Sequence, residues 1–428
     1  MFYFAFDKYM THAFPLDELK PLNCTGRGRD RLHPMVYDND ILGDFSLTLV
    51  DTLDTLVVLN DKASFSHAIR LVIDHVSFDL DSRVQVFETT IRVLGGLAHL
   101  LATDARFGFE LDWYNDELLA LAHDLGLRLM PAFTASPTGI PFSRVNLRHG
   151  MLPDELSDTC PAGAGTLILE FGMLSRLTGD PQFEEAAHHA LEGLWSRRSK
   201  LGLVGNTLDV VTGAWLGRIF TVGAGIDSYI EYLLKAEILF DEPLYGRMFE
   251  EIYRSTMLNA RDLQGYLYLW IDMHDHSLRT EFVDSLGAFF SGLQVLDGDI
   301  DNAIRGHLVY YEIWRKYGLL PERYSFKTHK PTMSYYPLRP EFVESTYFLY
   351  RATKNPFYLE VGEMIVESLQ TYARVECGFT SIEDVVTMEK ANRMESFFLS
   401  ETLKYLYLLF DEVGDKAAPH VNATCRVP

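Results

Sequence analysis

The sequence carries a degenerate internal repeat, in which an acidic residue and a serine open an apolar run. The copies are IDSYIEYLL at Asp227, VDSLGAFF at Asp284, VESTYFLY at Glu344 and MESFFLSET at Glu395. They recur at intervals of roughly 50 to 60 residues, a period typical of folds built from repeated supersecondary units. A unit of this length holds two helices and their connections, so the repeat predicts stacked helical hairpins.

The segments between these acids have a helical hydrophobic period. In FEEAAHHALEGLW and YLEVGEMIVESLQTY the apolar residues recur at i, i+3, i+4 and i+7, which places them on one face of a helix. The turns Gly-Asp-Pro at 179–181 and Lys-Asn-Pro at 354–356 separate paired helices, because proline cannot continue the helix before it.

Three further segments have a similar form, so that the expected inner helices begin near residues 54, 88, 166, 227, 284, 344 and 395. Seven stacked hairpins either extend as an open solenoid or close into a ring. A closed ring would gather the starts of the inner helices around one opening.

The acids at these helix starts have two interpretations. An acidic residue that begins a helix is most often a cap, stabilised by free N–H groups and the helix dipole. The acids here, including Glu395 and Glu401 in MESFFLSETLKYLYLLF, stand among aromatic and aliphatic residues. Buried carboxylates need arginines, a metal ion or shared protons, and such a cluster could perform acid/base chemistry.

Individual residues keep their simpler interpretations on this evidence alone. Arg92 follows Glu88 by four residues, so an ordinary ion pair along a helix explains both of them. Glu341 and Glu344 stand one turn apart and could form a solvated first helical turn.

Composition excludes some functions. A formal net charge of −22 argues against binding to nucleic acid, which needs clustered lysine and arginine. No segment reaches the roughly 18 consecutive apolar residues of a membrane span, and the first ten residues do not form a signal peptide. The four cysteines lack the spacing of a zinc site but permit two disulfides, and Asn23 and Asn422 fit the glycosylation pattern.

Longer motifs make the chain recognisable. The motifs are FSLTLVDTLDTLVVL, VQVFETTIRVLGGL, RVNLRHG, TCPAGAGTLILEFGMLSRLTGDP, GAGIDSYIEYLLKAEILF, YPLRPEFVESTYFLYRATKNP and RMESFFLSETLKYLYLLF. In these motifs the chain resembles glycoside hydrolase family 47, the class I α-1,2-mannosidases, and within it the endoplasmic-reticulum degradation-enhancing α-mannosidase-like proteins. The resemblance implies an all-α fold, an (α/α)7 barrel, with one catalytic domain over residues 1–410 and an atypical tail over 411–428.

The resemblance also implies a reaction, the inverting, calcium-assisted removal of terminal α-1,2-linked mannose from N-glycans. Glu88 matches the family's proton donor, Glu341 its base and Asp227 a third catalytic acid that competes with Glu88 for the donor role. Glu322 matches a further acid of the catalytic set. The residues that match the surrounding sugar-binding and water-orienting groups are Asp54, Arg92, Arg339, Glu344, Glu395 and Glu401.

The sequence departs from the family where calcium binds. The family uses a threonine in a T-E-[AG]-H stretch, which this chain does not contain, and Thr424 is the candidate ligand that remains. Cys24 and Cys377 lie in the matched region and Cys425 does not, so we expect a disulfide between the first two.

By resemblance, the protein would act in the lumen of the endoplasmic reticulum on high-mannose N-glycans of misfolded glycoproteins, with endoplasmic-reticulum oxidoreductases or other quality-control proteins as possible partners. Two alternatives are open. One is a mannose-binding, lectin-like protein without turnover, which the missing calcium motif favours. The other is a helical-repeat scaffold that binds proteins along a concave face.

Overall fold

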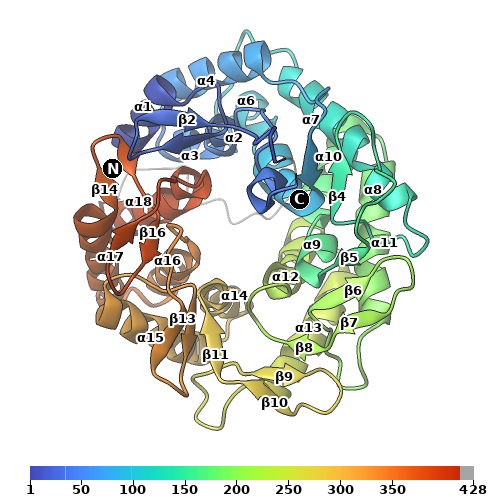
Figure 1. Ribbon diagram of the computed structural model, residues 1–428, viewed down its shortest axis with the longest axis vertical. Coiled ribbons are helices and arrows are strands. Elements are labelled where there is room, and N and C mark those ends of the chain that lie inside the picture. The colour runs from blue at the N-terminus through green and yellow to red at the C-terminus, as the bar shows by residue number, and fades with distance from the viewer. Residues whose placement is uncertain (34, 98, 415–428) are drawn as a thin grey trace.

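The computed structural model describes residues 1–33, 35–97 and 99–414. Its helices form two concentric rings, and the chain passes alternately from one ring to the other (Figure 1). The inner helices are α2 (Leu47–Asp51) with α3 (Leu53–Val58), α5 (Val86–Thr89) with η2 (Thr90–Leu94) and α6 (Leu100–Thr103), α10 (Ile168–Thr178), α12 (Asp227–Phe240), η3 (Leu286–Ala288) with α14 (Phe289–Asp297), α16 (Glu341–Thr353), and η5 (Phe398–Thr402) with α18 (Leu403–Gly414).

The outer ring covers the inner one. Its helices are α1 (Phe2–His12), α4 (Lys62–His75), α7 (Glu117–Leu129), α11 (Gln182–Ser196), α13 (Pro243–Asn259), α15 (Ile300–Tyr317) and α17 (Phe357–Ser368), which continues as η4 (Leu369–Ala373). Three short helices lie in connections: η1 (Tyr37–Asp40), α8 (Pro131–Thr134) and α9 (Pro161–Gly165). None of the helices in the described ranges is both long enough and apolar enough to cross a bilayer.

The inner ring is closed. Each inner helix contacts the next, from α2 and η2 through α10, α12, α14 and α16 to α18, and α3 contacts η5 to complete the circle. The predicted all-α (α/α)7 barrel is therefore confirmed. The repeat is confirmed with it, because Asp227 is the first residue of α12 and Glu344 lies in the first turn of α16.

The two ends of the barrel differ in their connections. At one end, inner and outer helices join through tight turns, which begin with left-handed residues at Gly179, Asp241, Gly298 and Lys354. A left-handed residue ends a helix by closing its last hydrogen bonds, and a new helix starts within a few residues. The expected turns at 179–181 and 354–356 are confirmed as two of these four connections.

Longer connections gather at the other end, which we call the strand end, because they lead from outer helices to the starts of inner ones. They contain small antiparallel sheets, and this end also holds the first turns of the inner helices. The sheets are β1 (Glu18–Lys20) with β2 (Thr25–Arg27); β3 (Arg83–Gln85) with β4 (Arg144–Asn146); β5 (Asp158–Thr159), β6 (Thr207–Asp209) and β7 (Trp215–Gly217); β8 (Ile219–Phe220), β9 (Trp270–Asp272) and β10 (Leu278–Thr280); β11 (Phe282–Asp284), β12 (Arg323–Ser325) and β13 (Lys330–Met333); β14 (Arg374–Val375) with β15 (Gly378–Phe379); and β16 (Ile382–Asp384) with β17 (Glu389–Lys390).

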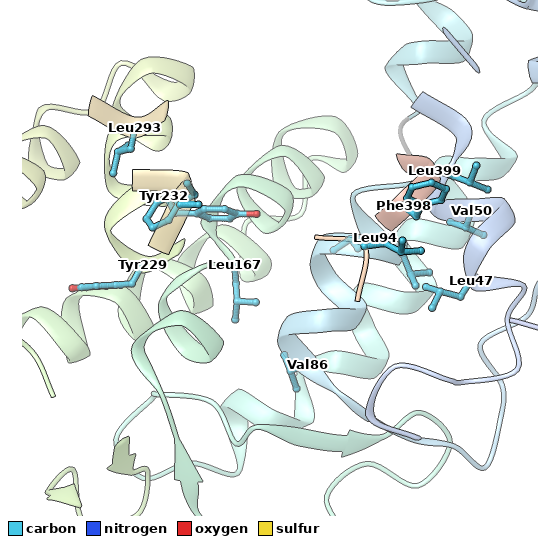
Figure 2. Packing of buried hydrophobic residues seen from close by; sticks show 14 of the residues in the cluster. Leu47, Val50, Val86, Leu94, Leu167, Tyr229, Tyr232, Leu293, Phe398 and Leu399 are labelled. Carbon is cyan, nitrogen blue, oxygen red and sulfur yellow. The ribbon is translucent and has the colours of Figure 1, made fainter. Parts of the chain in front are cut away.

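Apolar side chains hold the rings together. Figure 2 shows Tyr229 and Leu293 on one side of the ring, and Leu94 and Phe398 on the other. These four side chains are buried and belong to one continuous hydrophobic cluster. Burial of apolar surface contributes about 25 cal/mol per Å², so this cluster is the main source of stability for a ring of this size.

The two ends of the described chain meet at one seam of the barrel. Helix α1 contacts η5, so the first outer helix covers the last inner one. A disulfide joins Cys24, beside β2, to Cys377, between β14 and β15, which confirms the expected pairing. Cys160 is a free thiol, whereas Asn422, Thr424 and Cys425 lie outside the described residues. The boundary expected at residue 410 stays a prediction.

Candidate active site

Three of the predicted catalytic acids begin inner helices at the strand end. Glu88 lies in the first turn of α5, Asp227 opens α12 and Glu341 opens α16. These helices occupy alternate places in the inner ring, since α10 separates α5 from α12 and α14 separates α12 from α16. The three acids therefore stand on different walls around one barrel axis.

Glu88 is held by an arginine of its own helix. Arg92 Nε donates to Glu88 Oε2 at 2.8 Å, and both side chains are at most about one-fifth exposed. Arg92 also donates to Ser396 Oγ at 3.3 Å, and Ser396 donates to Asp51 Oδ2 at 2.5 Å. The expected ion pair along the helix is confirmed, and it extends into a network that reaches η5.

Glu322 has a similar arginine partner. Arg339 donates to both of its carboxylate oxygens, from Nη2 to Oε1 at 2.6 Å and from Nε to Oε2 at 3.1 Å. Ser285 Oγ also donates to Oε2, at 2.8 Å. Such a bidentate pair fixes the position of the carboxylate as well as its charge.

Phe397 brings these two pairs together. The guanidinium of Arg92 lies 5.0 Å from the centre of the Phe397 ring, and that of Arg339 lies 5.7 Å from it. Both arginines also interact electrostatically with Glu395. Residues from α5 with η2, from the segment before η5 and from the segment before α16 therefore form one polar cluster.

Glu341 and Asp227 are the least compensated acids in this cluster. Burial raises the pKa of Glu341 well above its usual value, although Arg339 opposes the rise, and Oε2 has no hydrogen-bond partner among the described residues. Burial also raises the pKa of Asp227 to about 7, despite the hydrogen bond that its Oδ1 accepts from the backbone of Ser228. A group such as Asp227, whose pKa lies near neutrality, can both give and take protons at working pH.

The two acids of the last inner helix have charged neighbours. Arg393 Nε lies 2.8 Å from Oε1 of Glu395, and burial raises the pKa of Glu395 to about 7. Burial likewise raises the pKa of Glu401, with Lys404 and Arg92 opposing the rise. The prediction that both acids belong to a polar region rather than to a dry core agrees with these partners.

Deeper in the ring, lysines compensate further acids. Lys235 Nζ lies 2.5 Å from Glu231 Oε1 and 4.0 Å from Glu344 Oε1, and Tyr405 donates to Glu344 at 3.0 Å. Burial raises the pKa of Glu344 to about 8. A second lysine, Lys404, lies 2.5 Å from Asp54 Oδ2 and joins α18 to α3.

Sequence reasoning missed several members of this cluster. They are Asp51, Glu231, Lys235, Asp284, Lys404 and Tyr405. Glu231 and Lys235 follow Asp227 at steps of four residues, so a search along the same helix face would have found both. Asp284 was seen as a repeat start, and its carboxylate accepts from Ala224 N at 3.1 Å and Gly287 N at 2.9 Å.

The described residues contain no ready-made cluster of metal-binding side chains. Calcium takes six to eight oxygen ligands, whereas the described parts of the chain contain no group of three or more His, Cys, Asp or Glu side chains arranged to hold a metal. Glu88, Glu322 and Glu395 are each bonded to an arginine instead. We therefore derive no catalytic step through calcium.

Comparisons with known proteins agree with this geometry. The sequence profile of glycosyl hydrolase family 47 matches residues 1–419. Over 415 residues the chain is 47% identical to ER degradation-enhancing alpha-mannosidase-like protein 1 of Schizosaccharomyces pombe. The aligned region covers 96% of this chain and 53% of that protein. It is also 47% identical over 416 residues to ER degradation-enhancing alpha-mannosidase-like protein 2 of Homo sapiens, covering 96% of this chain and 69% of the relative. The chain thus spans about half the length of the yeast relative.

A solved structure supports the fold. The α-1,2-mannosidase from Trichoderma reesei superposes with a TM-score of 0.84, covering 96% of this chain and 91% of that chain at 24% sequence identity. The profile match over nearly the whole chain and the identity to curated relatives establish the family, and the closed double ring of helices agrees with it. The chain belongs to glycosyl hydrolase family 47.

Proposed function

We propose that the protein is an inverting α-1,2-mannosidase that trims N-glycans of misfolded glycoproteins. The observation that carries the proposal is the placement of Glu88, Asp227 and Glu341 on three alternate walls of the ring, all at the strand end. Inverting hydrolysis needs a proton donor on one side of the glycosidic bond and a base that activates water on the other. Acids on different walls of one ring can meet that requirement.

The local chemistry favours a division of roles. The unpaired Oε2 of Glu341 can accept a proton from water, and the burial that raises the pKa of Glu341 makes it a stronger base once it is ionised. Asp227, whose pKa burial raises to about 7, keeps a proton to donate near neutral pH. Arg92 fixes the carboxylate of Glu88 toward the same region.

The names of the relatives support a cellular compartment and a process for this activity. Both curated relatives quoted above are called ER degradation-enhancing, which supports action in the endoplasmic-reticulum lumen during disposal of misfolded glycoproteins. High-mannose N-glycans would be the substrate, and oxidoreductases or other quality-control proteins the partners. Calcium assistance is part of the same proposal, with Thr424 as its candidate ligand.

Mannose release from a high-mannose glycoprotein tests the proposal. Wild type should release mannose as the β-anomer, detected by NMR immediately after cleavage, and Glu88→Gln should be slower by about 10²- to 10⁴-fold. Glu184→Gln is the matched control, because Glu184 of outer helix α11 pairs with Arg176 in the last turn of α10, at the end of the barrel away from the strand end. Equal release by wild type and Glu88→Gln would refute the assignment.

A lectin-like role is the second candidate, favoured by the missing T-E-[AG]-H stretch. It predicts that the wild-type protein binds high-mannose glycans and that no free mannose accumulates, even with millimolar calcium. Binding measured beside the release assay separates the two functions.

A further inference from the structure

A groove of about 820 Å³ lies on the outer wall, outside the polar cluster described above. It lies between the second half of α15, the connection after α13 and the segment of β12 with the residue that follows it. Its lining residues are Asp262, Gln264, Tyr266, Leu267, Leu308, Val309, Glu312, Ile313, Arg315, Lys316, Tyr324 and Phe326. Its volume falls in the range of roughly 300 to 1,000 Å³ that is usual for ligand sites.

The groove and the candidate active site use the same β-hairpin. Glu322, which Arg339 holds in the polar cluster, directly precedes β12. Tyr324 within that strand and Phe326 directly after it line the groove. The connection after α13 and the last turns of α15 also belong to the strand end. The groove and the predicted catalytic acids therefore share one end of the barrel.

Aromatic side chains line part of the groove, and packing and hydrogen bonds hold them in place. The rings of Tyr324 and Phe326 pack edge to face with their centres 5.2 Å apart, and Lys316 donates to the Tyr324 hydroxyl at 3.3 Å. On the opposite side, Asp262 accepts from the backbone of Tyr266 at 2.7 Å and of Leu267 at 2.9 Å. These bonds hold the connection that presents Tyr266, whose side chain is 44% exposed.

Polar groups of several kinds surround the aromatic surface. Gln264 offers an amide, and Glu312 and Arg315, both exposed, are paired with each other at 3.0 Å along α15. A sugar ring has a C–H face that packs on an aromatic ring and hydroxyl groups that bond to amides, carboxylates and guanidinium groups. A purely apolar peptide segment would instead remove the exposed charges of Glu312 and Arg315 from water without offering them new hydrogen bonds, which is unfavourable even for an ion pair.

We propose that the groove is a second saccharide-binding site, which holds another arm of the branched high-mannose glycan while one terminal mannose occupies the acid cluster. The inference rests on the proposed function, since it assigns a place to the rest of the same substrate. Tyr266 stacks on the second arm, and Gln264 bonds to its hydroxyl groups.

The test compares two ligands of different size. Affinity is measured in a Glu88→Gln background by saturation-transfer NMR and calorimetry, with α-1,2-mannobiose as the small ligand and a free branched high-mannose oligosaccharide as the large one. Tyr266→Ala should weaken binding of the branched oligosaccharide by about 2- to 10-fold and leave mannobiose unchanged. Leu263→Ala is the matched control, because Leu263 is fully exposed in the same connection and does not line the groove.

The remaining outcomes overturn the proposal. Equal weakening for both saccharides would mean that Tyr266 acts through the acid cluster, and no weakening would mean that the groove does not bind the glycan. A loss seen only with a glycan attached to a polypeptide would assign the groove to the polypeptide. Failure of wild type to release mannose would refute the proposed reaction, whereas the binding comparison would still decide whether this groove holds saccharide.

Discussion

Arg92 Nε lies 2.8 Å from Glu88 Oε2, one turn along the same inner helix. The pair is nearly buried, and Arg92 also donates to Ser396, so its guanidinium links η2 to the segment that precedes η5. Replacing Arg92 with alanine leaves the carboxylate of Glu88 without its arginine, and we expect mannose release to fall by about 10-fold or more. Arg92→Lys should rescue little, because an ammonium group cannot reproduce the directed bonds of a guanidinium.

Arg128 provides the control for this prediction. Its Nε lies 2.9 Å from Asp124 Oδ2 at the same four-residue spacing, but on outer helix α7. Arg128→Ala should leave kcat and KM for mannose release unchanged and lower stability by no more than about 1 kcal/mol. Comparable losses of activity in both variants would show that an intact ion pair, rather than its place at the cluster, is what matters.

Ionisation of Asp227 should cause the loss of activity at alkaline pH. Burial raises its pKa to about 7, so the side chain keeps its proton below that pH and loses it above. If Asp227 donates the proton, kcat/KM declines as pH rises through about 7, and Asp227→Asn abolishes most of the activity at every pH. If Asp227→Asn retains measurable activity and its kcat/KM declines at alkaline pH as in the wild type, then Glu88 is the proton donor instead.

The buried acids also predict how stability depends on pH. Burial raises the pKa of Asp51, Asp227 and Glu395 to about 7 and that of Glu344 to about 8. In the unfolded chain these groups ionise near pH 4, so between about pH 4 and 8 the folded state binds more protons and stability falls as pH rises. We expect Tm to drop by at least ~2 °C between pH 6 and pH 8.5 in calorimetry. Asp227→Asn should reduce that drop, and a Tm that rises over this interval would contradict the assignment.

The repeat and the helical period are local signals, so they were sufficient to predict stacked helical hairpins, whereas the closed (α/α)7 ring was predicted from the resemblance to the family. The period of acids at Asp227, Asp284 and Glu344 marks the starts of inner elements, and the Gly-Asp-Pro turn marks a tight connection at the other end. The ion pair of Glu88 and Arg92 was likewise visible, since both residues belong to one helix.

The partners of the acids were harder to predict, because they come from distant parts of the chain. Lys404 reaches Asp54 across 350 residues, and Ser396 reaches Asp51 across 345. Such residues come together only when the ring closes, so no local sequence pattern predicts their contacts. The role of each acid also depends on burial, which spacing alone does not determine.

A substitution at Gly223 tests whether the position of Asp284 matters for function. A methyl group at this position would stand 2.0 Å from Asp284 Oδ1, and Asp284 is held in place by Ala224 N and Gly287 N. Gly223→Ala must therefore displace Asp284, whose charge influences Asp227. We expect mannose release to fall by about 10-fold and stability to fall by about 1–3 kcal/mol.

Gly163→Ala serves as its control. The added methyl group there would stand 3.3 Å from Cys160 Sγ, a contact that a small shift relieves. Activity and Tm close to wild type are expected for Gly163→Ala, with circular dichroism to confirm that both variants keep their helices. Full activity in a correctly folded Gly223→Ala protein would show that the position of Asp284 is not critical.

The disulfide at the seam should be a major contributor to stability. Cys24 and Cys377 are 353 residues apart in sequence and join the connection after α1 to the one after α17, where the ring closes. Removing such a link frees the unfolded chain, so Cys24→Ala with Cys377→Ala should cost about 2–5 kcal/mol and lower Tm. Cys160→Ser is the control, since serine keeps a side-chain acceptor for Gly163 N and Cys160 forms no disulfide. Dithiothreitol should lower the Tm of wild type and of Cys160→Ser alike and leave the double variant unaffected; a wild-type Tm that does not respond to reduction would mean that the seam is held by its packing and ion pairs instead.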